Sequence, residues 1–171
     1  ALIGMTAKYK PVNNLNFYGQ LMIDNLDMKK LTVKGYQGNT WGFQLGSKYF
    51  NMFGVQNLNL QLEYNQVRPY AYAHENSLQS YTHFNQSVAH PLGANFKEAV
   101  GFINYRYRRL FAEWQCNYAV TGLDTNNTNW GQNVFASQLN ATSGYQSEGN
   151  KIGQGVKTHL FETGIRAYYL F

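Results

Sequence analysis

The sequence predicts an all-β protein, an antiparallel transmembrane β-barrel of which residues 1–171 form the C-terminal portion, with about seven strands. Three observations support this prediction. Apolar and polar residues alternate along segments of roughly ten residues, the length that a tilted strand needs to cross a bilayer. Aromatic residues make up 16% of the chain and charged residues only 13%, whereas about a quarter of an ordinary soluble domain is charged. Short and long connections also alternate along the chain.

Each predicted strand is a stretch in which every second residue is apolar, because side chains of a strand point alternately to two faces. In the clearest stretch, Leu58, Leu60, Leu62 and Tyr64 alternate with Asn, Gln and Glu, and we expect the apolar set to face lipid. A soluble sandwich also alternates, but here the charged residues collect opposite the apolar face, as expected of a wet lumen. The predicted strands lie in residues 3–10, 15–24, 41–49, 57–65, 98–107, 110–120 and 161–171.

The connections orient the predicted barrel. The short ones are "PVNN", "NMFGVQN" and the turn around Arg108, and the long polar ones span about 25–39, 67–97 and 121–156. Outer-membrane barrels have short periplasmic turns and longer extracellular loops, so we expect the last strand to end in the periplasm at Phe171. The chain opens in what reads as the middle of a strand, and seven is an odd number. We therefore expect a larger barrel, completed by a further barrel segment or by another outer-membrane protein.

Composition excludes several other classes of protein. The net charge is +5, but the basic residues are scattered, so we expect no nucleic-acid partner. The single Cys116 excludes an internal disulfide framework. No apolar run has the roughly 18 to 20 residues that a membrane helix needs.

Several stretches, among them "YGQLMIDN", "LEYNQVRPYAYAH", "YTHFNQSVAHPLGANFKE" and "TGLDTNNTNWGQNVF", resemble the Wzi-like capsule-assembly proteins of the Bacteroidetes outer membrane, a group with relatives linked to gliding motility. The similarity spans nearly the whole chain. It implies a large monomeric barrel in the bacterial outer membrane that holds surface polysaccharide, and this chain would supply well under half of that barrel.

The loop over residues 67–98 interrupts the alternation and holds three of the four histidines. Sugars offer hydroxyl groups to hydrogen-bond and C–H faces to stack, so a glycan site needs aromatic rings beside polar groups. A second polar loop adds a tryptophan. The alternative is that these residues only fold the loop over the barrel mouth. The candidate carbohydrate-binding residues are Arg68, Tyr70, Tyr72, His74, Tyr81, His83, Asn85, His90, Asn95 and Trp130.

We expect no catalytic residue, no metal and no cofactor. His74, Glu75, His83 and His90 do not match the spacing of zinc motifs, and no nucleophile elbow is present. The sequence therefore predicts an outer-membrane barrel that binds or anchors surface polysaccharide, with outer-membrane lipid and the glycan as partners. The alternatives are a passive porin-like channel, or a structural component of a gliding-motility or secretion-associated complex.

Overall fold

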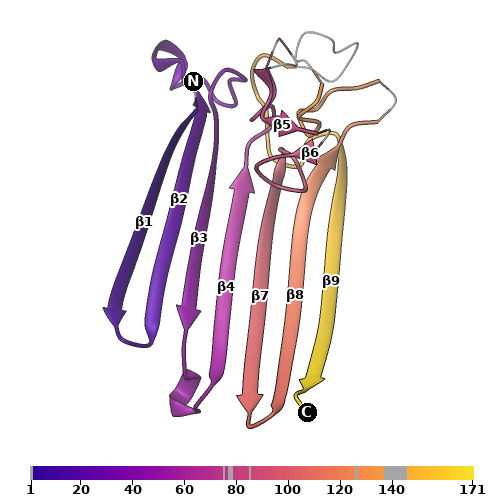
Figure 1. The fold of residues 1–171 in the computed structure, drawn as a ribbon. Helices are drawn as coiled ribbons and strands as arrows, with labels where there is room; N and C mark the ends of the chain where they lie inside the picture. The colour runs from indigo at the N-terminus through magenta and orange to yellow at the C-terminus, as the bar shows by residue number, and fades with distance from the viewer. Residues whose placement is uncertain (1, 75, 77–78, 85, 126, 137–145) are drawn as a thin grey trace.

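The computed structural model of the chain describes residues 2–74, 76, 79–84, 86–125, 127–136 and 146–171, and it is all-β. Figure 1 shows long strands side by side, with loops gathered at one end and short turns at the other. The long strands are β1 (Ile3–Val12), β2 (Leu15–Asn25), β3 (Thr40–Tyr49), β4 (Leu58–Val67), β7 (Phe96–Tyr107), β8 (Leu110–Leu123) and β9 (Val156–Tyr169). In the described ranges no helix has the length and apolarity of a membrane span.

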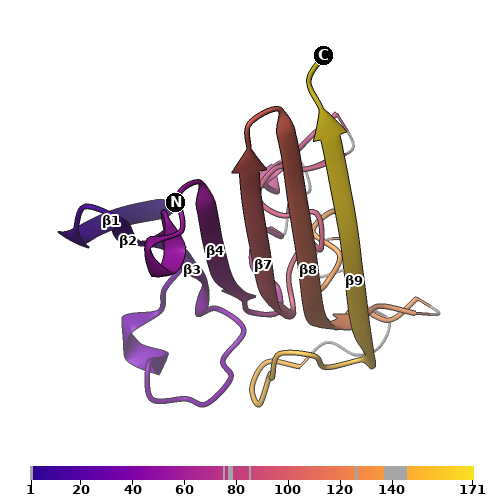
Figure 2. The same cartoon turned by 90° about the horizontal axis from the view of Figure 1, so that it is seen from below.

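The seven long strands form one antiparallel sheet in the order β1-β2-β3-β4-β7-β8-β9, so each strand pairs with its neighbours along the chain. The predicted all-β fold with seven antiparallel neighbours is confirmed. Several boundaries shift by one or two residues, and the largest difference is at the loop end. There Val156 to Thr158 pair with Thr121 to Leu123, so β8 extends past the predicted 110–120, and β9 begins before the predicted 161–171 and ends at Tyr169. The sheet is open, and within the described residues β1 and β9 each pair along one edge only. Seen from below in Figure 2, it bends between β1–β2 and β7–β9.

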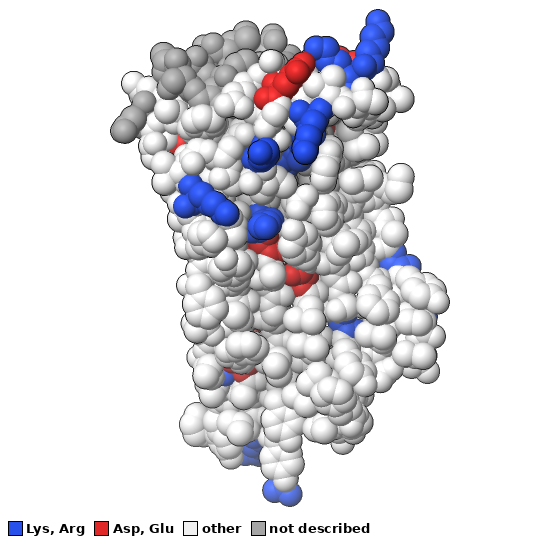
Figure 3. Space-filling view, turned by 180° about the vertical axis from the view of Figure 1, so that it is seen from behind, with Lys and Arg blue, Asp and Glu red and all other residues white. Residues whose placement is uncertain are grey.

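One face of the sheet is apolar and exposed. The registers bring Leu60, Ile103, Trp114 and Ile165 into one row across β4, β7, β8 and β9. Exposure on this face is high for apolar side chains, 49% for Leu62 and 79% for Ile165. Figure 3 shows one side of the molecule, where Lys and Arg gather toward the loop end and uncharged residues cover most of the rest. We call the surface of the sheet that contains the row of Leu60, Ile103, Trp114 and Ile165 the apolar face.

The opposite face is polar and carries hydrogen bonds between strands. Glu63 on β4 accepts hydrogen bonds from Gln44 Nε2 at 3.0 Å, from Gln61 Nε2 at 2.7 Å and from the Tyr18 hydroxyl. The Tyr18 ring lies over Gly46, its partner on β3, where a Cβ atom would overlap the ring. We call this surface the polar face.

At the loop end, the long connections pack into a small core against the polar face. This core joins the end of β4, the start of β7 and the connection that follows β8, and it contains Val67, Ala71, Tyr72, Ala94, Phe96 and Val134. The short elements are the 3-10 helices η1 (Met28–Lys30) and η2 (Met52–Gly54) and the two-residue strands β5 (Thr82–His83) and β6 (Gln86–Ser87). Of these four short elements, η2 lies at the turn end of the sheet and the other three lie at the loop end.

Candidate functional site

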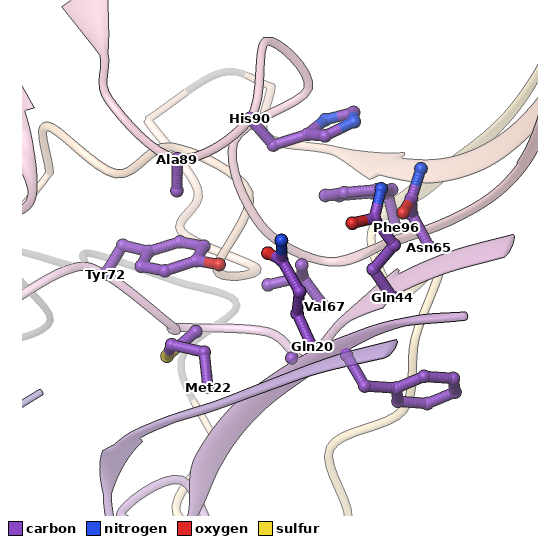
Figure 4. Close-up of a pocket in the computed structure, with 11 residues that line it drawn as sticks. Gln20, Met22, Gln44, Asn65, Val67, Tyr72, Ala89, His90 and Phe96 are labelled. Carbon is purple, nitrogen blue, oxygen red and sulfur yellow. The ribbon is translucent and has the colours of Figure 1, made fainter. Parts of the chain in front are cut away.

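A pocket lies where the long loop covers the polar face (Figure 4). Its volume is about 140 Å³. The strand registers build its floor, because Gln20, Gln44 and Asn65 occupy one row across β2, β3 and β4, and the next row toward the loops is more apolar. That second row contributes Met22, Gly42, Val67 and Phe96. We call the space above these two rows the amide pocket.

The loop supplies the roof of the amide pocket with Tyr72, Ala89 and His90. Figure 4 shows the Tyr72 ring lying across the pocket with its hydroxyl end directed toward Gln20. The ring stacks on Tyr81 at 5.9 Å between centroids. Burial, with the nearby groups of Asp24 and Tyr81, raises the pKa of Tyr72 to about 12, so its hydroxyl is protonated and can donate a hydrogen bond at neutral pH.

Two histidine–carboxylate pairs hold this loop on the sheet. His90 Nε2 lies 3.0 Å from Glu98 Oε2 on β7, and the imidazole stacks on Phe96 with 4.3 Å between centroids. His74 Nε2 lies 3.3 Å from Asp24 Oδ1 on β2. The other oxygen of Asp24 accepts from the Tyr72 backbone N–H at 2.8 Å. The loop is thus fixed on both sides of the amide pocket.

The carboxylate of Glu98 is buried and its hydrogen bonds are well satisfied. Besides His90, it accepts from Asn65 Nδ2 at 3.0 Å and from Asn117 Nδ2 at 2.9 Å. Such a network compensates the desolvation of a buried carboxylate and fixes the Asn65 amide at the edge of the pocket. Glu98 therefore acts as a positioning residue beneath the pocket.

The amide pocket is lined by side-chain amides, a phenol, an imidazole and apolar surface. Amides and the Tyr72 hydroxyl both donate and accept, and Met22, Val67 and Phe96 offer apolar contact. This combination suits a ligand that carries several hydroxyl groups on a carbon ring, because hydroxyl groups also donate and accept. In the described part of the chain, no group of three or more His, Cys, Asp or Glu is arranged to hold a metal ion.

Three of the predicted binding residues are used to build the loops. Arg68 donates from Nη1 to the Asn39 carbonyl at 2.7 Å and lies over the Trp41 ring, and burial lowers its pKa. Tyr70 is 1% exposed and donates its hydroxyl to a backbone carbonyl. Asn95 is 0% exposed. In this structure the side chains of Tyr70 and Asn95 are inaccessible to a ligand.

At the base of the loops, Asn95 joins the loop between β4 and β7 to the end of β8 and to the connection between β8 and β9. Its amide donates to the backbone carbonyls of Gly122 at 3.0 Å and Gln154 at 2.9 Å, and more weakly to that of Trp130 at 3.4 Å. Its side-chain oxygen accepts from the Gly153 N–H at 2.7 Å. Trp130 therefore belongs to this base and lies partly buried against Gly155.

The remaining predicted residues divide between the pocket and the outer surface of the loop. Tyr72 and His90 line the amide pocket, and His74 lines a neighbouring cavity with Asp24. Tyr81 is 41% exposed, and His83 is exposed and contacts Phe84 with 4.1 Å between ring centroids. The predicted residue Asn85 lies outside the described residues.

Sequence reasoning missed the pocket amides Gln20, Gln44 and Asn65, which it treated only as polar strand positions. A signal was present, since each lies on the polar side of its predicted strand. Pairing the β3–β4 hairpin outward from its short turn would have aligned Gln44 with Asn65, whereas β2 and β3 are joined by a long loop, so the register of Gln20 with Gln44 does not follow from the sequence.

The fold and the pocket define an open antiparallel meander sheet with one apolar face, one polar face and a loop-covered end. Comparison with protein-family models, with curated proteins and with solved structures gives no match to this chain.

Proposed function

We propose that this chain forms part of the wall of an outer-membrane β-barrel that binds surface polysaccharide at its loop end. The observation that carries the proposal is the amide pocket, in which three side-chain amides, a phenol and an imidazole converge above an apolar patch. These groups match the hydroxyl groups and C–H faces of a sugar. The pocket has a volume of about 140 Å³, and in this proposal it holds one sugar unit of the polysaccharide.

The apolar face supports the location in a membrane. Large side chains such as Leu45, Leu62, Phe161 and Ile165 are between 49% and 79% exposed, although they share one continuous face. Apolar patches of this extent are rare on soluble monomers and are normally covered by a partner or by lipid. The free edges of β1 and β9 would be paired by further strands of the same barrel, because unpaired backbone groups are costly in lipid.

The position of the loop favours glycan binding over a passive channel. Tyr72, Ala89 and His90 of the long loop lie over the polar face, which would line the lumen, and two histidine–carboxylate pairs fix the loop there. A loop fixed in this way narrows the lumen at its outer end. A steady open conductance of the purified barrel in planar bilayers would therefore contradict the proposal and favour a porin.

The proposal is tested by removing the pocket amides. Gln20→Leu combined with Gln44→Leu should leave the barrel assembled but release surface polysaccharide into the medium and weaken binding of isolated surface polysaccharide to the detergent-extracted protein. Gln115→Leu is the matched control, because it removes an amide from the polar face away from the pocket. If the double variant holds as much polysaccharide as the control, the pocket is not the glycan site.

A further inference from the structure

The apolar face carries almost no charge. Only two of the paired strand residues whose side chains lie on this face are of the types Lys, Arg, Asp or Glu. These two residues are Lys97 and Lys157. Each lysine is the second residue of its strand, β7 or β9, so both lie at the loop end of the sheet. Both residues are exposed, and within the described residues no carboxylate forms an ion pair with either one. Two cations on an otherwise uncharged apolar surface need an explanation.

The registers bring the two lysines together with a histidine. Lys97 pairs with Val120, which in turn pairs with His159, and Lys157 precedes His159 by two residues on the same face of β9. Val120 is only 4% exposed, although it lies on the apolar face, so its neighbours cover it. We call Lys97, Lys157 and His159 the basic patch.

An aromatic row borders the basic patch on the side toward the turns. This row contains Tyr64, Ala99, Tyr118 and Phe161 on successive strands. The Tyr118 hydroxyl lies 2.7 Å from His159 Nδ1, so the row and the patch are in direct contact. Aromatic residues collect at the interface between the hydrocarbon and the headgroups of a membrane, which sets the basic patch at headgroup level.

We propose that the basic patch binds the phosphate group of a phosphorylated glycolipid in the outer leaflet. The ammonium groups of Lys97 and Lys157 would form charge-assisted hydrogen bonds to the phosphate oxygens, with His159 adding a ring N–H. The acyl chains would lie along Phe161 and the apolar face below it. Lysine is costly at the centre of a bilayer and far less so at its interface, so the position of both cations at one end of the face is what a lipid headgroup requires. This inference rests on the proposed location in a membrane but not on the glycan pocket.

The experiment compares lipids that differ only in phosphate. The purified protein in detergent is mixed with lipid A or with the dephosphorylated glycolipid of the same acyl chains, and bound lipid is counted by native mass spectrometry. We expect lipid A to bind at least tenfold more tightly. Lys97→Gln with Lys157→Gln should remove this preference, because glutamine keeps the size of the side chain without the charge. Lys34→Gln with Lys151→Gln is the matched control, since both are exposed loop lysines at the same end of the sheet.

Equal binding of the two lipids by the unaltered protein would overturn the inference, as would an unchanged preference in the Lys97 and Lys157 variant. The membrane proposal fails separately, if the protein is recovered in the aqueous fraction without detergent. Unchanged circular dichroism of the double variant establishes that it is folded.

Discussion

His90 Nε2 lies 3.0 Å from Glu98 Oε2, and through this contact the long loop is fastened to β7 beside the amide pocket. The pair spans eight residues of chain, yet it joins the roof of the pocket to the network that holds Asn65. The roof and the floor of the candidate site therefore share one buried carboxylate, which is only 6% exposed.

Replacing His90 by Phe should loosen the loop while leaving the sheet assembled. The ring stack on Phe96 can be kept, but Glu98 loses one of its hydrogen bonds, which costs roughly 1–3 kcal/mol for a buried charged group. Limited proteolysis should then cleave residues 68–95 faster. His83→Phe is the control, because His83 is exposed. Equal cleavage of the two variants would mean that the His90–Glu98 contact does not hold the loop.

Gly46→Ala should destabilise the sheet. A Cβ atom at this position would overlap the Tyr18 ring, so the ring must move and its hydrogen bond to Glu63 is lost. We expect a loss of about 1–3 kcal/mol in the free energy of unfolding, measured by urea titration in detergent. Gly164→Ala is the matched control, because nothing lies within 4 Å of a Cβ atom there. Equal stability of the two variants would show that the close approach to Tyr18 is unimportant.

Asn95→Ala should disorganise the part of the loop end where the β4–β7 loop meets β8 and the β8–β9 connection. The substitution leaves the carbonyls of Gly122 and Gln154 and the Gly153 N–H without their partner. Since each buried group left unpaired costs about 1–3 kcal/mol, we expect a loss of several kcal/mol and rapid hydrogen exchange in these segments. Gln56→Ala, in an exposed turn at the other end, should change neither measurement. Slow exchange in the Asn95 variant would contradict the role of Asn95.

Tyr72 should ionise well above the ordinary pKa of a tyrosine. Its pKa is raised to about 12, so the neutral phenol is favoured in the folded state. Its contribution to stability is complete below the ordinary tyrosine pKa of about 10 and is lost as the pH rises toward about 12. The difference in phenolate absorbance between the unaltered protein and Tyr72→Phe, followed against pH, isolates this group. A difference titration centred near the ordinary value would mean that the ring is exposed in solution.

Labels on neighbouring residues of β4 test the membrane location. Leu60 lies on the apolar face and Gln61 on the polar face. A spin label at Leu60 should be accessible to oxygen, which concentrates in lipid, and one at Gln61 to a water-soluble nickel complex. Labels that report the same environment at both positions would rule out a barrel wall.

The strands were predictable because alternation is a local property of the sequence. Leu58, Leu60 and Leu62 mark an apolar face whatever surrounds them, so the strand and its two faces follow from the sequence alone. The roles of Arg68 and Asn95 could not be predicted in the same way. Asn95 donates a hydrogen bond to the carbonyl of Gln154, which is 59 residues away in the sequence. Arg68 donates one to the carbonyl of Asn39, which is 29 residues away. Such contacts depend on how the loops pack, and a polar residue that binds a sugar looks the same in sequence as one that binds a backbone carbonyl.

The hydrogen bonds of Asn95 also have a consequence for the order in which the chain folds, because they reach residues close to the last strand. Every contact in the seven-stranded sheet joins long strands that follow one another along the chain, so the sheet can grow by one strand at a time. The bonds from Asn95 to Gly153 and Gln154 require the segment that immediately precedes β9. The loop end is therefore completed only when the last strand arrives. A chain halted before β9 would keep the two histidine–carboxylate pairs of the loop but lack the hydrogen bonds of Asn95 to Gly153 and Gln154, so its loop end would be incompletely joined.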